Sequence, residues 1–184
     1  MIILALSGPS GVGKNSILHE LSQHIPNTFF SVSCTTRDPR PGEIHGVHYN
    51  FLSHAEFDSM VEDGKFAEWK QYGINKYGTP CEPIEAALKK QQVVLMDLEV
   101  EGAVDLRLFC HEKKIMLFDF FIMPPDMSML RDRLLKRGTE SEEAIDGRIR
   151  RGHQEILRAD EFTHTFINDE LGRCAKEILD ELPF

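Results

Sequence analysis

Cysteine is scarce in this 184-residue chain, and the few cysteines follow no pattern that would link them to one another or to a metal. The four are Cys34, Cys81, Cys110 and Cys174, with no Cys-x-x-Cys pair and no local His/Cys spacing typical of zinc. We therefore expect neither a disulfide framework nor a structural metal. Such a chain suits a reducing compartment, so we expect a cytoplasmic protein.

Long apolar runs are also missing. Residues 2–6 are apolar, but no basic region precedes them and Gly8 and Pro9 follow almost at once, which argues against a signal peptide. The stretch 116–125 contains Asp119 and falls far short of the roughly 20 residues that a membrane helix needs. We expect no membrane partner.

The chain also lacks an excess of positive charge. The 21 Lys and Arg residues face 30 Asp and Glu residues, and the net charge of −9 argues against a protein that coats nucleic acid. Residues 131–151 are the exception, with seven basic and five acidic side chains. This segment suits a small anionic ligand, or it forms a salt-bridged helix face.

The length fits one domain spanning 1–184, and the average shares of glycine and proline, 13 and 9 residues, give no sign of disorder. Short apolar runs alternate with segments of helical spacing, which predicts an α/β fold with a mostly parallel sheet covered by helices on both faces. We expect strands over 2–7, 93–98, 117–123 and 165–167, and helices over 16–24, 84–90, 104–110, 127–136, 141–158 and 170–182.

Residues 33–80 differ from this pattern, because short β-like pieces alternate there with polar turns. We expect strands over 30–34, 49–51 and 66–69. Ser53 and Glu56 have the spacing of a capping box, which predicts a helix from there to about Asp63. We interpret this region as a small β-rich insert on the core.

A glycine-rich loop directly follows the first strand and directly precedes a helix, which is the context that a phosphate-binding P-loop requires. Its glycines let the backbone wrap around phosphate, and the lysine reaches the β- and γ-phosphates. The residues expected to bind ATP are Gly8, Pro9, Ser10, Gly11, Val12, Gly13, Lys14, Asn15 and Ser16.

Asn15 is a departure from the P-loop pattern. The motif places Ser or Thr after the lysine, where its hydroxyl binds Mg²⁺. An amide oxygen is also a neutral oxygen ligand for this ion, although on a longer side chain. We therefore predict Asn15 as a metal ligand, and a one-residue shift along a helix makes Ser16 a poor substitute.

Several further motifs occur in a fixed order. They are the segment SCTTRDPRPGE at 33–43, EW at 68–69, YGTP at 77–80, the acidic strand end DLEVEGA at 97–103 and RGTESEE at 137–143. With the P-loop, this ordered set covers nearly the whole chain and resembles the guanylate kinase family of P-loop nucleoside monophosphate kinases. The resemblance implies a P-loop kinase fold with a GMP-binding insert, 33–80, and a helical lid, 133–150.

The resemblance also implies Mg²⁺-dependent transfer of the γ-phosphoryl group of ATP to GMP, giving GDP and ADP. It makes Arg37, Arg40, Tyr49 and Tyr77 ligands of the GMP phosphate, and Ser33, Glu68, Thr79 and Glu99 contacts of the guanine. Guanine offers N–H donors beside an acceptor oxygen, which suits carboxylates and hydroxyls. The family often has Asp where this chain has Glu99.

The lid of the family is similar to the basic segment. Charge spreads over the phosphoryl group in the transition state, so cationic side chains stabilise it. The catalytic candidates, besides Lys14, are Arg133, Arg137 and Arg148, whereas Arg150 and Arg151 are expected to face solvent. The segment at Asn168 resembles the family's adenine side only weakly.

Two other functions stay open from the sequence. A phosphotransferase of the same fold could act on another phosphorylated acceptor, such as a ribose phosphate, or a non-catalytic scaffold domain could bind phosphopeptides through the arginines. Glu68 and Thr79 disfavour the first, and Lys14 disfavours the second. The sequence decides neither the oligomeric state nor the choice between GMP and dGMP.

Overall fold

The computed structural model describes residues 1–137 and 142–183, apart from the side chains at 136, 137 and 144. Its centre is a five-stranded sheet in the order β2-β7-β1-β8-β9, and every neighbouring pair is parallel. The strands are β1 (Ile2–Ser7), β2 (Thr28–Phe30), β7 (Val93–Asp97), β8 (Met116–Met123) and β9 (His164–Ile167). The predicted parallel sheet is confirmed.

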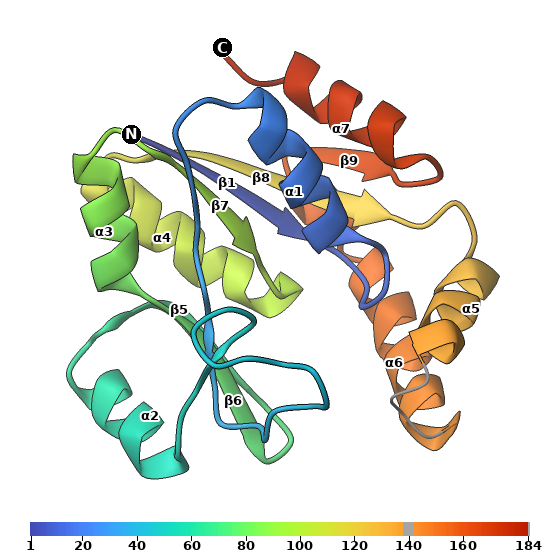
Figure 1. Ribbon diagram of the computed structural model, residues 1–184, viewed down its shortest axis with the longest axis horizontal. Coiled ribbons are helices and arrows are strands. Elements are labelled where there is room, and N and C mark those ends of the chain that lie inside the picture. The colour runs from blue at the N-terminus through green and yellow to red at the C-terminus, as the bar shows by residue number, and fades with distance from the viewer. Residues whose placement is uncertain (138–141, 184) are drawn as a thin grey trace.

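Helices cover both faces of this sheet (Figure 1), as the sequence predicted. Helices α3 (Cys81–Lys89) and α4 (Ala103–Lys113) pack on one face, and α1 (Lys14–His24) and α7 (Leu171–Asp180) on the other. Side chains of β1 alternate between them, with Ile3 in the first core and Leu4 in the second. Burying each such side chain stabilises the fold by about 1.5–3 kcal/mol.

A second sheet stands below the first in Figure 1. It has the order β4-β3-β6-β5 and consists of β3 (Cys34–Thr35), β4 (Asn50–Phe51), β5 (Phe66–Tyr72) and β6 (Asn75–Pro80). The single strand expected over 30–34 is wrong, because β2 ends at Phe30 in the core sheet and β3 begins at Cys34 in the second sheet. β6 was not predicted as a strand.

Helix α2 (His54–Glu62) begins where the capping box predicted. The Ser53 hydroxyl accepts a hydrogen bond from the Glu56 backbone N–H, and the Glu56 carboxylate accepts one from the Ser53 N–H at 2.8 Å. The reciprocal bonds satisfy two backbone donors that a helix start leaves unpaired.

Helices α5 (Met127–Arg137) and α6 (Glu142–Ile156) form a pair at one side of the sheet, followed by a 3₁₀ turn, η2 (Ala159–Glu161). A second 3₁₀ turn, η1 (Val100–Gly102), links β7 to α4. The predicted helices over 127–136 and 141–158 correspond to α5 and α6, with residues 138–141 outside the described part.

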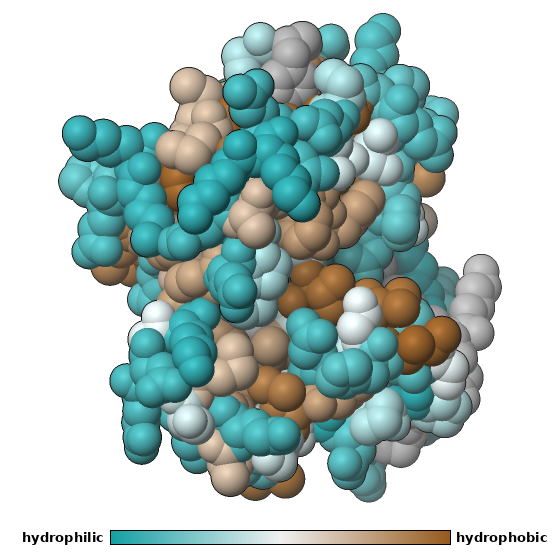
Figure 2. Space-filling view, turned by 60° about the vertical axis from the view of Figure 1, so that its left-hand side comes forward, coloured by the Kyte–Doolittle hydropathy of each residue, from teal (hydrophilic) through white to brown (hydrophobic). Residues whose placement is uncertain are grey.

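Hydrophilic side chains cover most of the face in Figure 2, and apolar residues gather there in patches between them. Within residues 1–137 and 142–183, no helix combines the length and apolar character needed to cross a bilayer. The four cysteines are free thiols.

Candidate functional site

A cavity of about 510 Å³, the main cavity, lies near the carboxyl ends of the core strands. Ligands of open α/β sheets gather at this edge. Its walls come from the P-loop, the second sheet, the end of β7 and helix α6. Among the lining residues are Ser10, Lys14, Asn15, Ser16, Arg37, Arg40, Tyr49, Tyr77, Asp97, Glu99, Arg148, Arg151 and Glu155.

The P-loop is a tight turn that only glycine can make at two positions. Gly8 has a φ of +139°, and a Cβ there would lie 2.3 Å from the carbonyl oxygen of Ile122. Gly13 has a φ of +105°, and a Cβ there would lie 2.5 Å from Nδ2 of Asn168. The loop therefore places the N-terminus of α1 at the cavity. A helix N-terminus binds anions favourably.

Lys14 is buried at the first position of α1. Its ammonium donates to the carbonyl oxygen of Gly8 at 2.7 Å and lies 3.4 Å from Oδ1 of Asp97. Burial disfavours the charged lysine, but the carboxylates of Asp97, Glu99 and Glu155 outweigh it and raise the pKa of Lys14. The lysine is therefore a fixed positive charge in the cavity wall.

In the part of the cavity wall that contains Arg37 and Arg40, the carboxylate of Glu43 accepts several hydrogen bonds. Glu43 accepts hydrogen bonds from both terminal nitrogens of Arg37, at 2.8 and 3.0 Å, and from the backbone N–H of Arg40 at 2.7 Å. Partial burial works against ionisation, yet these donors hold the pKa of Glu43 below its ordinary value. Both predicted phosphate-binding arginines thus face the main cavity.

The two predicted tyrosines lie beside these arginines. The Arg37 guanidinium carbon is 5.4 Å from the centroid of the Tyr49 ring. The Tyr49 and Tyr77 rings contact each other edge-on, with their centroids 6.1 Å apart. Burial, and then the nearby Asp97 and Glu99, raise the pKa of Tyr49 well above its ordinary value. Its hydroxyl therefore keeps its proton and can donate to an anion.

A smaller cavity of about 30 Å³ adjoins this wall and shares Tyr49, Tyr77 and Glu99 with the main cavity. Ser33 and Glu68, both predicted guanine contacts, also line it. We call it the guanine-side cavity for that reason.

A chain of side-chain hydrogen bonds runs along the guanine-side cavity. Thr79 donates to Oε1 of Glu68 at 2.5 Å, and the Ser33 and Thr79 hydroxyls lie 3.1 Å apart. Glu68 is only 7 % exposed, and this burial raises its pKa to about 7 although the Thr79 bond opposes the shift. The structure thus gathers all four residues predicted as guanine contacts, since Glu99 lies in the same wall.

Two of the predicted lid arginines line different cavities. Arg148 donates to the Ser10 hydroxyl at 2.6 Å and lines the main cavity. Arg133 instead donates to the Val12 carbonyl oxygen at 2.9 Å and lines a separate cavity of about 500 Å³ beside the P-loop. The side chain of Arg137 lies outside the described residues.

Asn168 also lines this separate cavity, together with Gly11, Gly13 and Ser16. Its amide donates to the Val12 carbonyl oxygen at 2.7 Å, so it supports the loop directly. The segment at Asn168, which resembles the adenine-binding segment of the family only weakly, therefore lies beside the P-loop.

Several residues that line the site were not predicted to do so, among them Arg151, Glu155 and Glu43. Arg151 is exposed, as expected, but it also lines the main cavity, and its guanidinium lies 5.1 Å from the centroid of the Tyr72 ring. Glu155 lies in the same wall. Glu43 stood in a quoted motif without a role, and only its position after two arginines could have indicated one.

Comparison with known proteins agrees with this geometry. The guanylate kinase family matches residues 1–182. The guanylate kinase of Gloeobacter violaceus is 41% identical over 99% of this chain and 86% of its own length. That of Deinococcus radiodurans is 43% identical over 97% of this chain and 73% of its own length.

A solved structure is similar as well. The crystal structure of guanylate kinase from Anaplasma phagocytophilum superposes with a TM-score of 0.76 at 27% identity, covering 97% of this chain and 82% of that one. The family match over almost the full length and the relatives at about 40% identity lead to one conclusion: the chain belongs to the guanylate kinase family.

Proposed function

We propose that the protein transfers the γ-phosphoryl group of ATP to GMP, giving ADP and GDP. One observation carries the proposal: a single cavity is lined both by Lys14 of the P-loop and by Arg37 and Arg40, which lie in the loop between β3 and β4. Two cationic phosphate sites that share one cavity suit transfer between two phosphorylated substrates.

On the donor side, the P-loop residues 8–16 would hold the phosphates of ATP. The separate cavity beside the loop, lined by Arg133 and Asn168, has room for the adenosine. We accordingly assign Arg133 to the donor nucleotide and keep Lys14 and Arg148 as the cations that face the moving phosphoryl group. Arg137 remains a proposed member of this set.

On the acceptor side, Arg37, Arg40, Tyr49 and Tyr77 would bind the GMP phosphate, because arginine grips phosphate oxygens in pairs. The ionised carboxylate of Glu68 can accept from the N1–H and N2–H₂ groups of guanine, and the Ser33 hydroxyl can donate to O6 while Thr79 stays bonded to Glu68. Glu99 adds a second carboxylate. Adenine would leave these groups mismatched.

The donors present suit Mg²⁺, which prefers oxygen ligands. Asn15 and the carboxylate of Asp97 line the main cavity next to Lys14 and would hold the ion with the ATP phosphates. When bound, Mg²⁺ would neutralise the negative charge of the phosphates during the transfer. The protein's own part is to hold both substrates and to place Lys14 and Arg148 around the transferred group; no general base is needed, because the acceptor oxygen is already ionised.

This assignment gives different parts of the single domain different substrates to bind. We propose that residues 33–80, which build the second sheet, form the acceptor-binding insert, and that 133–150 form the lid. The core sheet and the P-loop would serve the donor.

The test is to measure ADP release from ATP with GMP, dGMP, AMP and ribose phosphates, each with Mg²⁺. We expect turnover with GMP and discrimination against AMP by roughly 10⁴, as for sites that hydrogen-bond their substrate. The Lys14→Met variant is the control for contaminating kinases and should lose nearly all activity. Turnover with a ribose phosphate but not GMP would overturn the proposal, as would phosphopeptide binding without any turnover.

A further inference from the structure

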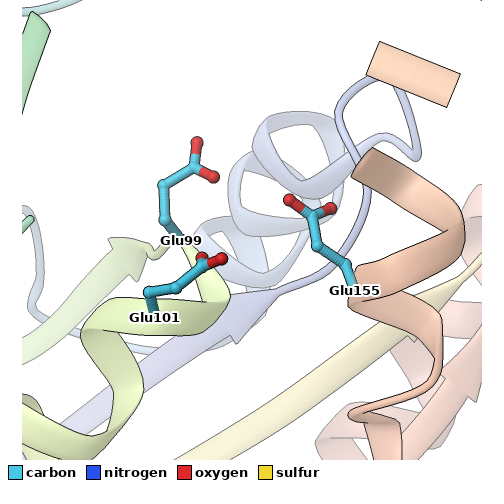
Figure 3. A group of neighbouring side chains, drawn as sticks. All are labelled: Glu99, Glu101 and Glu155. Carbon is cyan, nitrogen blue, oxygen red and sulfur yellow. The ribbon is translucent and has the colours of Figure 1, made fainter. Parts of the chain in front are cut away.

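Three glutamate side chains converge at the edge of the main cavity. Glu99 and Glu101 come from the segment between β7 and α4, and Glu155 comes from α6. Each offers a carboxylate oxygen, and these oxygens all lie within 4.8 Å of one another. Figure 3 shows the carboxylate of Glu155 directed from its helix toward the other two.

Glu155 is the unusual member of this cluster. It is only 4 % exposed, and its Oε2 atom is buried without a hydrogen-bond partner among the described residues. An unsatisfied buried carboxylate oxygen is costly, because it has lost water and gained nothing in return. Such an atom, directed toward other carboxylates, is available to bind a cation.

The charges around the cluster are unbalanced. Asp97 and the three glutamates are four carboxylates in electrostatic contact, and Lys14 and Arg151 are the cations that face them. Arg158 also lies near Glu101, but it is paired with Glu161 at 2.7 and 2.8 Å. With all four carboxylates ionised, they outnumber Lys14 and Arg151, and this local negative charge favours a bound cation.

The geometry fits a hard cation. Calcium binds carboxylate oxygens at about 2.3–2.6 Å, so two oxygens on one such ion can lie up to roughly 5 Å apart, as the cluster allows. Tyr72 donates to Oε2 of Glu101 at 2.5 Å, which fixes the orientation of that carboxylate as supporting hydrogen bonds do around metal ligands.

We propose that Glu99, Glu101 and Glu155 form a binding site for a hard divalent cation of the Ca²⁺ or Mn²⁺ kind, separate from the Mg²⁺ that accompanies ATP. The ion would tie the segment after β7, which carries the proposed guanine contact Glu99, to α6, which carries Arg148. It would bind without any nucleotide, because the protein alone supplies the three carboxylates.

The site can be tested on the nucleotide-free protein with Mn²⁺ as the probe. Free Mn²⁺ is measured by electron paramagnetic resonance during a titration at about pH 8, where carboxylates compete least with protons. We expect one bound Mn²⁺ per chain, displaced by Ca²⁺. Glu155→Gln and Glu101→Gln should each weaken binding by at least about tenfold, because each removes a charged ligand.

The matched control is Glu85→Gln, which removes the same charge on α3, where Glu85 pairs with Lys113. It should bind Mn²⁺ like the wild type, and thermal unfolding of each variant shows that the fold is kept. The proposal is overturned if no Mn²⁺ binds up to roughly millimolar concentration. It is equally overturned if both cluster variants bind as the wild type does, or if only Asp97→Asn loses the ion, which would place it beside Lys14.

Discussion

Glu43 binds Arg37 through a two-point contact, with its carboxylate oxygens 2.8 and 3.0 Å from the two terminal nitrogens of the guanidinium. Such bidentate pairs are the strongest of the common side-chain hydrogen bonds. Glu43 also accepts from the backbone N–H of Arg40. One carboxylate therefore fixes the guanidinium of Arg37 and the backbone at Arg40, the two arginines that we assign to the GMP phosphate.

The first prediction concerns this pair. Glu43→Gln should raise the KM for GMP by roughly tenfold, because a charge-assisted hydrogen bond contributes about 1.5–3 kcal/mol and the amide keeps only part of it. The KM for ATP should stay nearly constant. Steady-state kinetics with either substrate varied give both values, and Glu62→Gln, on an exposed part of α2, is the control. Equal losses for both substrates would indicate a general loss of structure instead.

The core could be predicted from the sequence because its signals are local. Residues 2–7, 93–98 and 117–123 are apolar runs too short for buried helices and bounded by turn residues, and they correspond to β1, β7 and β8. The P-loop between β1 and α1 could be predicted from glycine spacing and its context alone.

The second sheet could not be predicted in the same way, because its strands depend on distant partners. Phe30 pairs with Leu95 in the core sheet, whereas Cys34 pairs with Gly78 in the second, so the chain changes sheets within an apparently continuous β pattern. β6 contains Gly78 and Pro80, which have low strand propensity. It is a strand because Tyr77 pairs with Lys70 on one side and Thr35 on the other.

In the site, too, some residues could be predicted from local sequence patterns and others could not. The P-loop motif indicated Lys14 and the family resemblance indicated Glu68, and both residues line the cavities described above. Arg151 and Glu155 stand in a long charged helix, where helical spacing alone does not tell which face meets the cavity. Only the packing of α6 against the site reveals them.

The second prediction rests on the buried carboxyl of Glu68, whose pKa of about 7 exceeds its ordinary value because burial disfavours the charged form. The ionised form can accept both guanine donors, whereas the protonated form cannot. The Kd for GMP should therefore rise by about tenfold for each pH unit below 7 and level off above it. Calorimetry between about pH 5.5 and 8.5 measures this.

The GMP phosphate itself titrates near pH 6, as phosphate monoesters do, so the scan needs a control. Glu68→Gln keeps the phosphate titration and removes the carboxyl, and its affinity should change less steeply near pH 7. It should also lose much of the preference for GMP over AMP, since an amide presents a donor as well as an acceptor. Identical pH profiles in the two proteins would mean that guanine is read elsewhere.

The third prediction uses the separation of Arg133 from Arg148. Arg133 lines the cavity beside the P-loop and donates to the Val12 carbonyl oxygen, so Arg133→Ala should mainly raise the KM for ATP. Arg148 faces the main cavity, so Arg148→Ala should mainly lower kcat, by about 10²–10³ as for other groups that stabilise developing charge. Steady-state kinetics separate the two effects. A fall in kcat alone for Arg133→Ala would instead return it to the transferring phosphoryl group.

The last prediction concerns Asn15, where the chain departs from the P-loop pattern. Asn15 is exposed on the first turn of α1 and lines the main cavity next to the buried Lys14, so its amide is in the wall where the motif expects a metal-binding hydroxyl. Mg²⁺ demands near-octahedral geometry at about 2.0–2.1 Å, and a longer side chain that supplies the oxygen should hold it less well.

Asn15→Ser should therefore lower the Mg²⁺ concentration needed for the half-maximal rate, by roughly tenfold if it restores one well-placed ligand. Asn15→Leu, which has similar size and no oxygen, should raise that concentration and lower kcat. The measurement is the steady-state rate against free Mg²⁺ at saturating ATP and GMP for the three proteins. If the three curves superimpose, Asn15 touches neither the ion nor its water shell, and the phosphates with Asp97 or Glu99 must hold it instead.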